Sequence, residues 1–217
     1  WWGEKLQSAL GEGWPEIVSV PQDNLYGMHL FSRLELQGPE VKRLIQDDIP
    51  SIHGWIILKS GERIRLHALH PRPPSPQESD TSLWRDAELL LVGKEIREHA
   101  GPSLLIGDLN DVAWSRTTKL FTRVSGMLDP RRGRGMFSTF HAGHRLLRWP
   151  LDHIFVTEHF TLGQMQRLKE FGSDHFPILA TLCYHPSRSD ENDTPRPDAE
   201  DKADVKETIH TARTAAS

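Results

Sequence analysis

Short apolar runs separated by turn residues constrain this fold more than any other feature of the sequence. The β-like runs are residues 16–20, 26–32, 51–58, 63–69, 103–106, 151–157, 160–168 and 176–184. Apolar residues with helical spacing occur in two places, between residues 83 and 96 and between residues 117 and 124. Many strands with few helices between them predict a layered α/β sandwich.

The composition predicts one globular core followed by a polar tail. Hydrophobic residues make up 37% of the 217 residues, and seven tryptophans and eight phenylalanines supply bulky core side chains. We therefore predict one domain over residues 1–185. From residue 186 onward the sequence is polar, acidic and proline-containing, which predicts a disordered acidic tail over residues 186–217.

Charge and cysteine content exclude several classes of protein. A net charge of −4 gives no overall basic bias toward nucleic acid or an anionic membrane. The single cysteine, Cys183, excludes an intramolecular disulfide framework, and its apolar surroundings favour a buried hydrophobe over a nucleophile. No apolar stretch approaches the roughly 20 residues needed to span a bilayer. The sequence begins on Trp1 without an initiator methionine, so we expect a fragment whose signal or anchor, if any, lies upstream.

The first candidate site is the tetrapeptide Gly-Asp-Leu-Asn at residues 107–110, directly after a buried strand. Asp108 and Asn110 are two residues apart, so on an extended segment both side chains point the same way. A carboxylate beside an amide carbonyl offers hard oxygen donors for Mg²⁺, or a base with an orienting group. An Asx-turn after a strand is the alternative reading of the same residues.

Further candidates lie at residues 67–70, 151–155 and 173–177. His175 follows Asp174, and a histidine held by a carboxylate can stay cationic and stabilise charge on a phosphoryl oxygen, although a surface or capping role is the alternative. His67 and His70 point to opposite faces of a strand, so one of them is expected to be structural. Asp152 enters an apolar strand, where a buried acid needs a charged or hydrogen-bonding partner.

The order of these motifs carries a resemblance. Leu-His-Pro at 69–71, Gly-Asp-Leu-Asn at 107–110, Leu-Asp-His-Ile-Phe at 151–155 and Gly-Ser-Asp-His-Phe-Pro at 172–177 resemble the endonuclease/exonuclease/phosphatase superfamily, which has the DNase-I-like fold. The resemblance runs from about residue 24 to residue 184, and longer stretches at 111–115 and 125–130 resemble a bacterial branch. It implies a four-layer α/β/β/α sandwich, here missing its first strands. The superfamily's first metal-site asparagine and its principal metal-binding glutamate would then precede residue 1.

The resemblance also implies roles for individual residues. His70 matches the mid-chain active-site histidine of the superfamily. Asp108 would activate or position the attacking water, and Asn110 would hold the scissile phosphate. His175 would stabilise the developing charge while Asp152 orients it, which is consistent with the needs of phosphoryl transfer.

These roles predict a hydrolase that depends on Mg²⁺ or Mn²⁺, with Asp108 and Asp174 near the metal. The substrate is left open between nucleic acid and a phospholipid or phosphoinositide head group. Residues 116–148 are rich in arginine, so Arg131 and Arg134 are candidates for binding substrate together with Asn110, and a solvated arginine loop is the plain alternative.

The rival hypothesis is a catalytically inactive fragment or a binding module that retains the fold. No obligate protein partner is evident from the sequence. The location stays open between the bacterial cytoplasm and a membrane, to which a segment upstream of residue 1 would anchor the protein.

Overall fold

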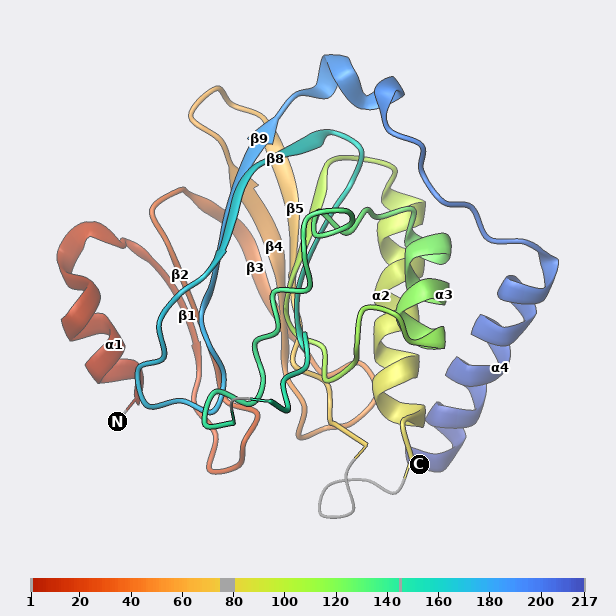
Figure 1. Cartoon of the computed structure of the whole chain (residues 1–217), viewed down its shortest axis with the longest axis horizontal. Coiled ribbons are helices and arrows are strands. Elements are labelled where there is room, and N and C mark those ends of the chain that lie inside the picture. The colour runs from red at the N-terminus through yellow and green to blue at the C-terminus, as the bar shows by residue number, and fades with distance from the viewer. Residues whose placement is uncertain (1, 75–80, 145, 217) are drawn as a thin grey trace.

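A five-stranded mixed sheet forms the centre of the computed structural model, which describes residues 2–74, 81–144 and 146–216 (Figure 1). Strands β5 and β6 are parallel, and the other neighbouring pairs are antiparallel. The parallel pair requires a crossover, which helix α2 supplies. In sheet order the strands are β3 (Leu36–Lys42), β4 (Ser51–Ile57), β5 (Arg63–Ala68), β6 (Ser103–Asp108) and β7 (Asp152–Val156).

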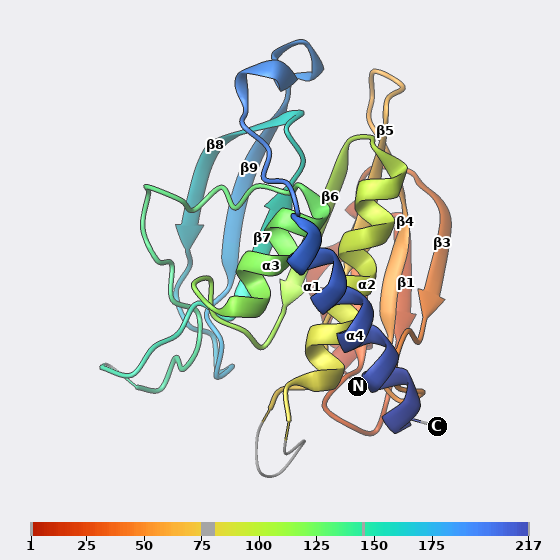
Figure 2. The ribbon, with the colours of Figure 1, turned by 90° about the vertical axis from the view of Figure 1, so that its right-hand side faces the viewer.

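Helices α2 (Leu83–His99) and α3 (Arg116–Ser125) cover one face of this sheet (Figure 2). The main hydrophobic core lies between them and the sheet, where Leu89 and Phe121 from the helices meet Phe155 from β7. The rings of Phe121 and Phe155 lie 5.1 Å apart and are fully buried. Among the described helices, none is both long and apolar enough to cross a membrane.

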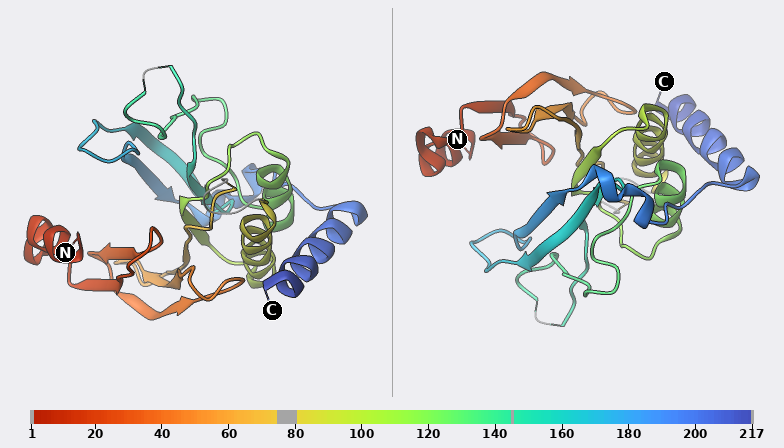
Figure 3. Two further views of the ribbon diagram at one scale, coloured as in Figure 1. Left: turned by 90° about the horizontal axis from the view of Figure 1, so that it is seen from below. Right: turned by 90° about the horizontal axis from the view of Figure 1, so that it is seen from above.

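Two antiparallel hairpins and a short helix lie on the other side of the sheet, away from α2 and α3 (Figures 1 and 3). A second, smaller core there joins Ile64 and Val156 of the central sheet to Phe160 of β8. The fold is therefore a layered α/β structure with a central mixed sheet, as the sequence predicted. The elements of this side are α1 (Trp2–Leu10), the 3-10 helix η1 (Gly11–Gly13), the pair β1 (Glu16–Val20) and β2 (Met28–Ser32), and the pair β8 (Phe160–Arg167) and β9 (Ile178–Tyr184).

The expectation of a disordered tail is wrong for the residues described after 185. They form a 3-10 helix, η2 (Pro186–Glu191), and a long helix, α4 (Ala199–Ala216), which packs against α2 and α3 (Figure 2). Val205, Ile209 and Ala212 are buried at helical spacing, so a narrow apolar stripe runs through an otherwise polar sequence. The carboxylate of Asp201 accepts two hydrogen bonds from Arg123 at 2.7 Å, which fixes α4 on α3.

Helix α2 also buries the carboxyl group of Glu88, and this gives a prediction about stability. One carboxyl oxygen has no hydrogen-bond partner among the described residues, and burial raises the pKa of Glu88 from 4.5 to about 8. Between these values the folded protein keeps the proton that the unfolded chain loses, so stability falls as pH rises through that window and then levels off. We expect Glu88→Gln to be more stable than the wild type. The difference in the free energy of unfolding should increase with pH, by at most about 1.4 kcal/mol for each pH unit.

Urea unfolding of both proteins at pH 5, 6, 7 and 8 measures this margin. Glu98, an exposed residue of the same helix, supplies the control, because Glu98→Gln should differ from the wild type by less than about 0.5 kcal/mol at every pH. A margin for Glu88→Gln that stays constant with pH would show that Glu88 is ionised in the folded protein.

Candidate active site

Two carboxylates meet where β6 ends and β7 begins. Asp108 is the last residue of β6, Asp152 is the first residue of β7, and the two are direct partners in the antiparallel register. Like charges opposite each other on neighbouring strands repel. The pair therefore needs a cation or a shared proton, and such an arrangement is typical of a functional site.

His175 lies between these two carboxylates. Its Nδ1 donates to Oδ2 of Asp152 at 2.7 Å, and its Nε2 lies 3.5 Å from Oδ2 of Asp108. The loop that carries His175 is held by Phe140, whose backbone forms an isolated bridge with His175 and whose ring lies 4.9 Å from the imidazole. The structure thus brings His175 and Asp152 into direct hydrogen-bond contact, and the role of Asp152 in orienting a catalytic histidine stays a prediction.

His70 reaches the same carboxylate from the end of β5. Its Nε2 lies 3.7 Å from Oδ2 of Asp108. The close approach of the two strands depends on Gly107, which has φ +144° and packs against Leu69 so tightly that a Cβ would lie 1.9 Å from the Leu69 carbonyl oxygen. Only glycine fits there, so the main chain itself brings His70 beside Asp108.

The pKa values of these groups follow from burial and from each other's charges. Burial, and then the charge of Asp152, raise the pKa of Asp108 to about 7. Burial lowers the pKa of His70, and the neighbouring His175 lowers it further. For His175 burial also acts downward, but the hydrogen bond to Asp152 and the charge of Asp108 outweigh it, so its pKa is raised.

Asn110 occupies a tight turn just beyond Asp108. Its backbone is left-handed, with φ +50°, and its N–H donates to Oδ1 of Asp108 at 2.8 Å. The side-chain amide donates to the carbonyl of Pro71 at 3.0 Å, one residue past His70. The Asx-turn is therefore present, and it places the Asn110 side chain beside the segment that follows His70; the binding of phosphate by Asn110 stays a prediction.

Three predicted site residues fall outside this group. Asp174 is exposed and does not belong to the group formed by Asp108, Asp152 and His175. Its charge nevertheless contributes to raising the pKa values of Asp108 and His175. Arg134 is exposed and donates to the carbonyl of Pro130 at 3.1 Å. Arg131 is only 4% exposed, so the alternative of a solvated loop is wrong for this residue, while its contact with substrate stays a prediction.

The guanidinium of Arg131 is used inside the protein. It donates to both carboxylate oxygens of Asp129, to the carbonyl of Asp152 at 3.1 Å and to Nδ1 of His153 at 2.7 Å. Two further bases of the same segment are also paired, Arg116 with Asp204 and Arg123 with Asp201 of α4. Arg145 lies outside the described residues. The arginine-rich segment therefore presents less free positive charge than its sequence indicates.

Two polar residues of the site neighbourhood were not predicted. Thr139 is buried, and its Oγ1 accepts from the backbone N–H of Asp152 at 3.3 Å. Burial raises the pKa of Asp152, but the hydrogen bond with His175, and after it the one with Thr139, lower that pKa below its usual value. Asp111 is buried behind the Asn110 turn. The sequence signals for Asp111 are its place directly after Asn110 and its position in the stretch 111–115, which resembles a bacterial branch of the superfamily, and nothing in the sequence marks Thr139.

The described residues contain two groups that could hold a metal ion. Asp108, Asp152 and His175 each offer a ligand atom, all within 4.8 Å of one another. His53, His67 and Glu95 form a second group, but Glu95 already pairs with Arg65 at 2.9 Å and with Lys42 at 3.5 Å. Only the first group has carboxylates whose own charges raise a pKa, and a cation would relieve that repulsion.

Comparison with known proteins gives one match to a family. The sequence profile described as "Endonuclease/Exonuclease/phosphatase family" matches residues 1–175. A search of the curated proteins found no match.

Solved structures of similar fold include a protein titled as a member of that family and a mannosyl-6-phosphatase, both from Bacteroides thetaiotaomicron, with TM-scores of 0.63 and 0.62 and 19% identity each. The alignments cover 82% of this chain and 78% of the first protein, and 83% and 80% for the second. D. rerio TDP2 complexed with a single-strand DNA product has a TM-score of 0.64 at 15% identity, covering 84% and 80%. At these identities the likeness shows a shared fold.

Proposed function

Because this chain belongs to the endonuclease/exonuclease/phosphatase family, we propose that it is a metal-dependent phosphoesterase that hydrolyses a phosphodiester or phosphomonoester by attack of an activated water. The observation that carries the proposal is the convergence of Asp108, Asp152 and His175 within 4.8 Å, with His70 beside them. Strands β5, β6 and β7 and the loop before β9 all deliver one of these side chains to the same end of the sheet.

Each side chain has a role that its environment supports. Asp108, with a pKa near neutral, positions the attacking water and accepts its proton. His175 is held by Asp152 and kept cationic by two carboxylates, so its Nε2–H stabilises charge that develops on the phosphoryl group. His70 and the Asn110 amide hold the phosphate oxygens.

The donor set fits a hard divalent cation, Mg²⁺ or Mn²⁺. Asp108 and Asp152 supply carboxylate oxygens, which both ions favour, and Asp174 lies near enough to act on Asp108 through its charge. A bound cation would polarise the phosphoryl oxygens and lower the pKa of a bound water.

Removal of metal gives the direct test of this function. We expect the protein to hydrolyse bis(4-nitrophenyl) phosphate with Mg²⁺ or Mn²⁺, to fall to the background rate with excess EDTA, and to recover when metal is added back. Release of nitrophenolate measures the rate. Glu95→Gln alters the other candidate metal group and should leave this response unchanged.

Hydrolysis that persists in EDTA would contradict the metal dependence. Absence of hydrolysis with both metals, in a protein that still binds Mg²⁺ by calorimetry, would favour the rival hypothesis of a binding module.

For the substrate we propose two alternatives, a nucleic acid and a phospholipid or phosphoinositide head group. Among structures of similar fold, one is named a mannosyl-6-phosphatase and another holds a single-strand DNA product, so this fold accepts both kinds of phosphate ester. Arg134 is exposed and is the residue that we propose for contact with substrate outside the catalytic group. A steep fall of nuclease activity with salt would identify nucleic acid, and activity confined to vesicles would identify a phospholipid or phosphoinositide head group.

A further inference from the structure

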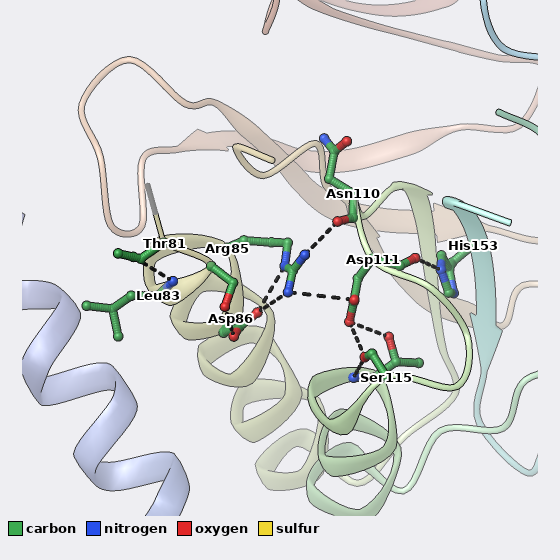
Figure 4. A network of polar contacts seen from close by, with 10 residues as sticks. Thr81, Leu83, Arg85, Asp86, Asn110, Asp111, Ser115 and His153 are labelled. Atoms are coloured by element: carbon green, nitrogen blue, oxygen red, sulfur yellow. Dashed lines mark hydrogen bonds and ion pairs between the residues drawn. The ribbon is translucent and has the colours of Figure 1, made fainter. Parts of the chain in front are cut away.

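Behind Asn110 a buried guanidinium from helix α2 holds the turn. Arg85, in the first turn of α2, donates through Nη1 to the backbone carbonyl of Asn110 at 2.7 Å (Figure 4). Asn110 is one of the few described non-glycine residues with positive φ, a conformation that asparagine tolerates better than most residues and that hydrogen bonds from the surroundings stabilise. Arg85 is therefore in the position from which that conformation can be enforced.

The charge of Arg85 is satisfied by acids on either side of it. Its Nε and Nη2 donate to Oδ1 of Asp86 at 2.9 and 2.7 Å, and Nη2 lies 3.6 Å from Oδ1 of Asp111. Asp111 is itself buried, and its other oxygen accepts from the hydroxyl groups of Ser115 and Thr118 at the start of α3. The guanidinium thus connects α2, the Asn110 turn and α3, and its side chain is only 9% exposed.

The same turn is fixed from the strand side. Nε2 of His153 donates to the backbone carbonyl of Asp111 at 2.8 Å, and His153 directly follows Asp152 on β7 (Figure 4). Asn110 and Asp111 are adjacent, so two successive carbonyls accept hydrogen bonds from different elements, one from Arg85 of α2 and the other from His153 of β7. Loss of the Arg85 contact removes one of the hydrogen bonds that fix this turn, which leaves those to Asp108, Pro71 and His153.

We propose that Arg85 is a positioning residue: through the Asn110 carbonyl it holds the turn that places the Asn110 amide beside the segment following His70, at the proposed phosphate site. Arg85 does not reach the reacting atoms, and its effect on catalysis passes through Asn110. This inference rests on the proposed function, because it assigns the effect to phosphate binding at the same site.

A double-mutant cycle separates positioning from general support of the fold. We expect Arg85→Gln to lower kcat/KM by about 10²-fold, the usual effect of a small misplacement of a binding group. In an Asn110→Ala background the same substitution should have almost no further effect, because the group that it positions is gone. Arg85→Lys keeps the charge but has a single donor group, so its activity should lie between those of the wild type and Arg85→Gln. If Arg85→Gln folds poorly, Arg85→Lys takes its place in the cycle.

Arg65→Gln is the matched control. Arg65 also pairs with an acid of α2, Glu95 at 2.9 Å, and is half-buried, but it makes no contact with the Asn110 turn. Its loss should leave kcat/KM within about threefold of the wild type. An equal loss for Arg85→Gln in both backgrounds would overturn the inference, since a merely structural effect is additive.

A second readout does not depend on activity. The sequence has three asparagines, Asn24, Asn110 and Asn192, so labelling with ¹⁵N-asparagine gives three backbone amide signals and three pairs of side-chain amide signals. Arg85→Gln should shift the backbone and side-chain signals of Asn110 and leave those of Asn24 and Asn192 in place. Unmoved Asn110 signals would overturn the positioning role even if the wild type hydrolysed nothing, so failure of the proposed function and failure of this inference give different results.

Discussion

Asp108→Asn is expected to lower kcat/KM for an aryl phosphodiester by about 10²–10⁴-fold, the range usual for loss of a general base. The amide can still accept the 2.8 Å hydrogen bond from the Asn110 N–H, so the turn should persist. It cannot accept a proton from water, and it is a weaker ligand for a divalent cation. The folded protein should lose nothing in stability, because the neutral amide removes the repulsion between residue 108 and Asp152 that helps raise the Asp108 pKa to about 7.

Rates and urea unfolding of the same preparations test both halves of this expectation. Glu170→Gln is the control, since Glu170 is an exposed acid in the loop before β9 and does not contact the carboxylate pair. An Asp108→Asn protein with wild-type activity would remove Asp108 from the chemistry. A large loss of stability would instead mean that the carboxylate is a structural group.

Arg131→Met is expected to lower the free energy of unfolding by about 3–5 kcal/mol, the usual result when one partner of a buried ion pair is removed. Asp129, 9% exposed at its side chain, would keep its charge without a partner. The carbonyl of Asp152 and Nδ1 of His153 would each lose a donor. Unfolding in urea measures the loss.

Two matched variants sharpen this result. Arg134→Met removes an exposed arginine of the same loop and should change the free energy of unfolding by less than about 0.5 kcal/mol. Replacing Asp129 by Leu together with Arg131→Met removes both charges and should restore part of the stability. If Arg131→Met unfolds like the wild type but raises KM, then Arg131 binds substrate after all and its burial is not essential.

The strands that carry the site could be predicted because their signals are local. Alternating or continuous apolar runs ending in Gly-Asp or beginning with Leu-Asp identify β6 and β7, and their order along the chain matched a family pattern. Strand β3 escaped prediction because Gly38 and Pro39 stand in its middle and break the β-like pattern. A proline is tolerated there because β3 is an edge strand, and its pairing with β4 shifts register between Gln37 and Glu40.

The parts that could not be predicted depend on partners distant in the sequence. Helix α4 has so few apolar residues that its sequence reads as a disordered acidic tail, and its order comes from packing on α2 and α3 and from the Arg123–Asp201 pair. Arg131 lies among glycines and arginines, a composition typical of exposed loops. Its burial follows from Asp129 and from two groups of β7, and no local pattern reveals those contacts.

Gly107 gives the site a property that matters for changing what the protein acts on. The spacing between His70 and Asp108 is set by two main chains in contact at Leu69 and Gly107, and a side chain at residue 107 has no room. Laboratory evolution of the substrate range therefore has no way to widen or narrow this spacing by substitution at residue 107. Substitutions that change the substrate range would therefore lie in the loops around the site, and the spacing between His70 and Asp108 would stay the same in all such variants.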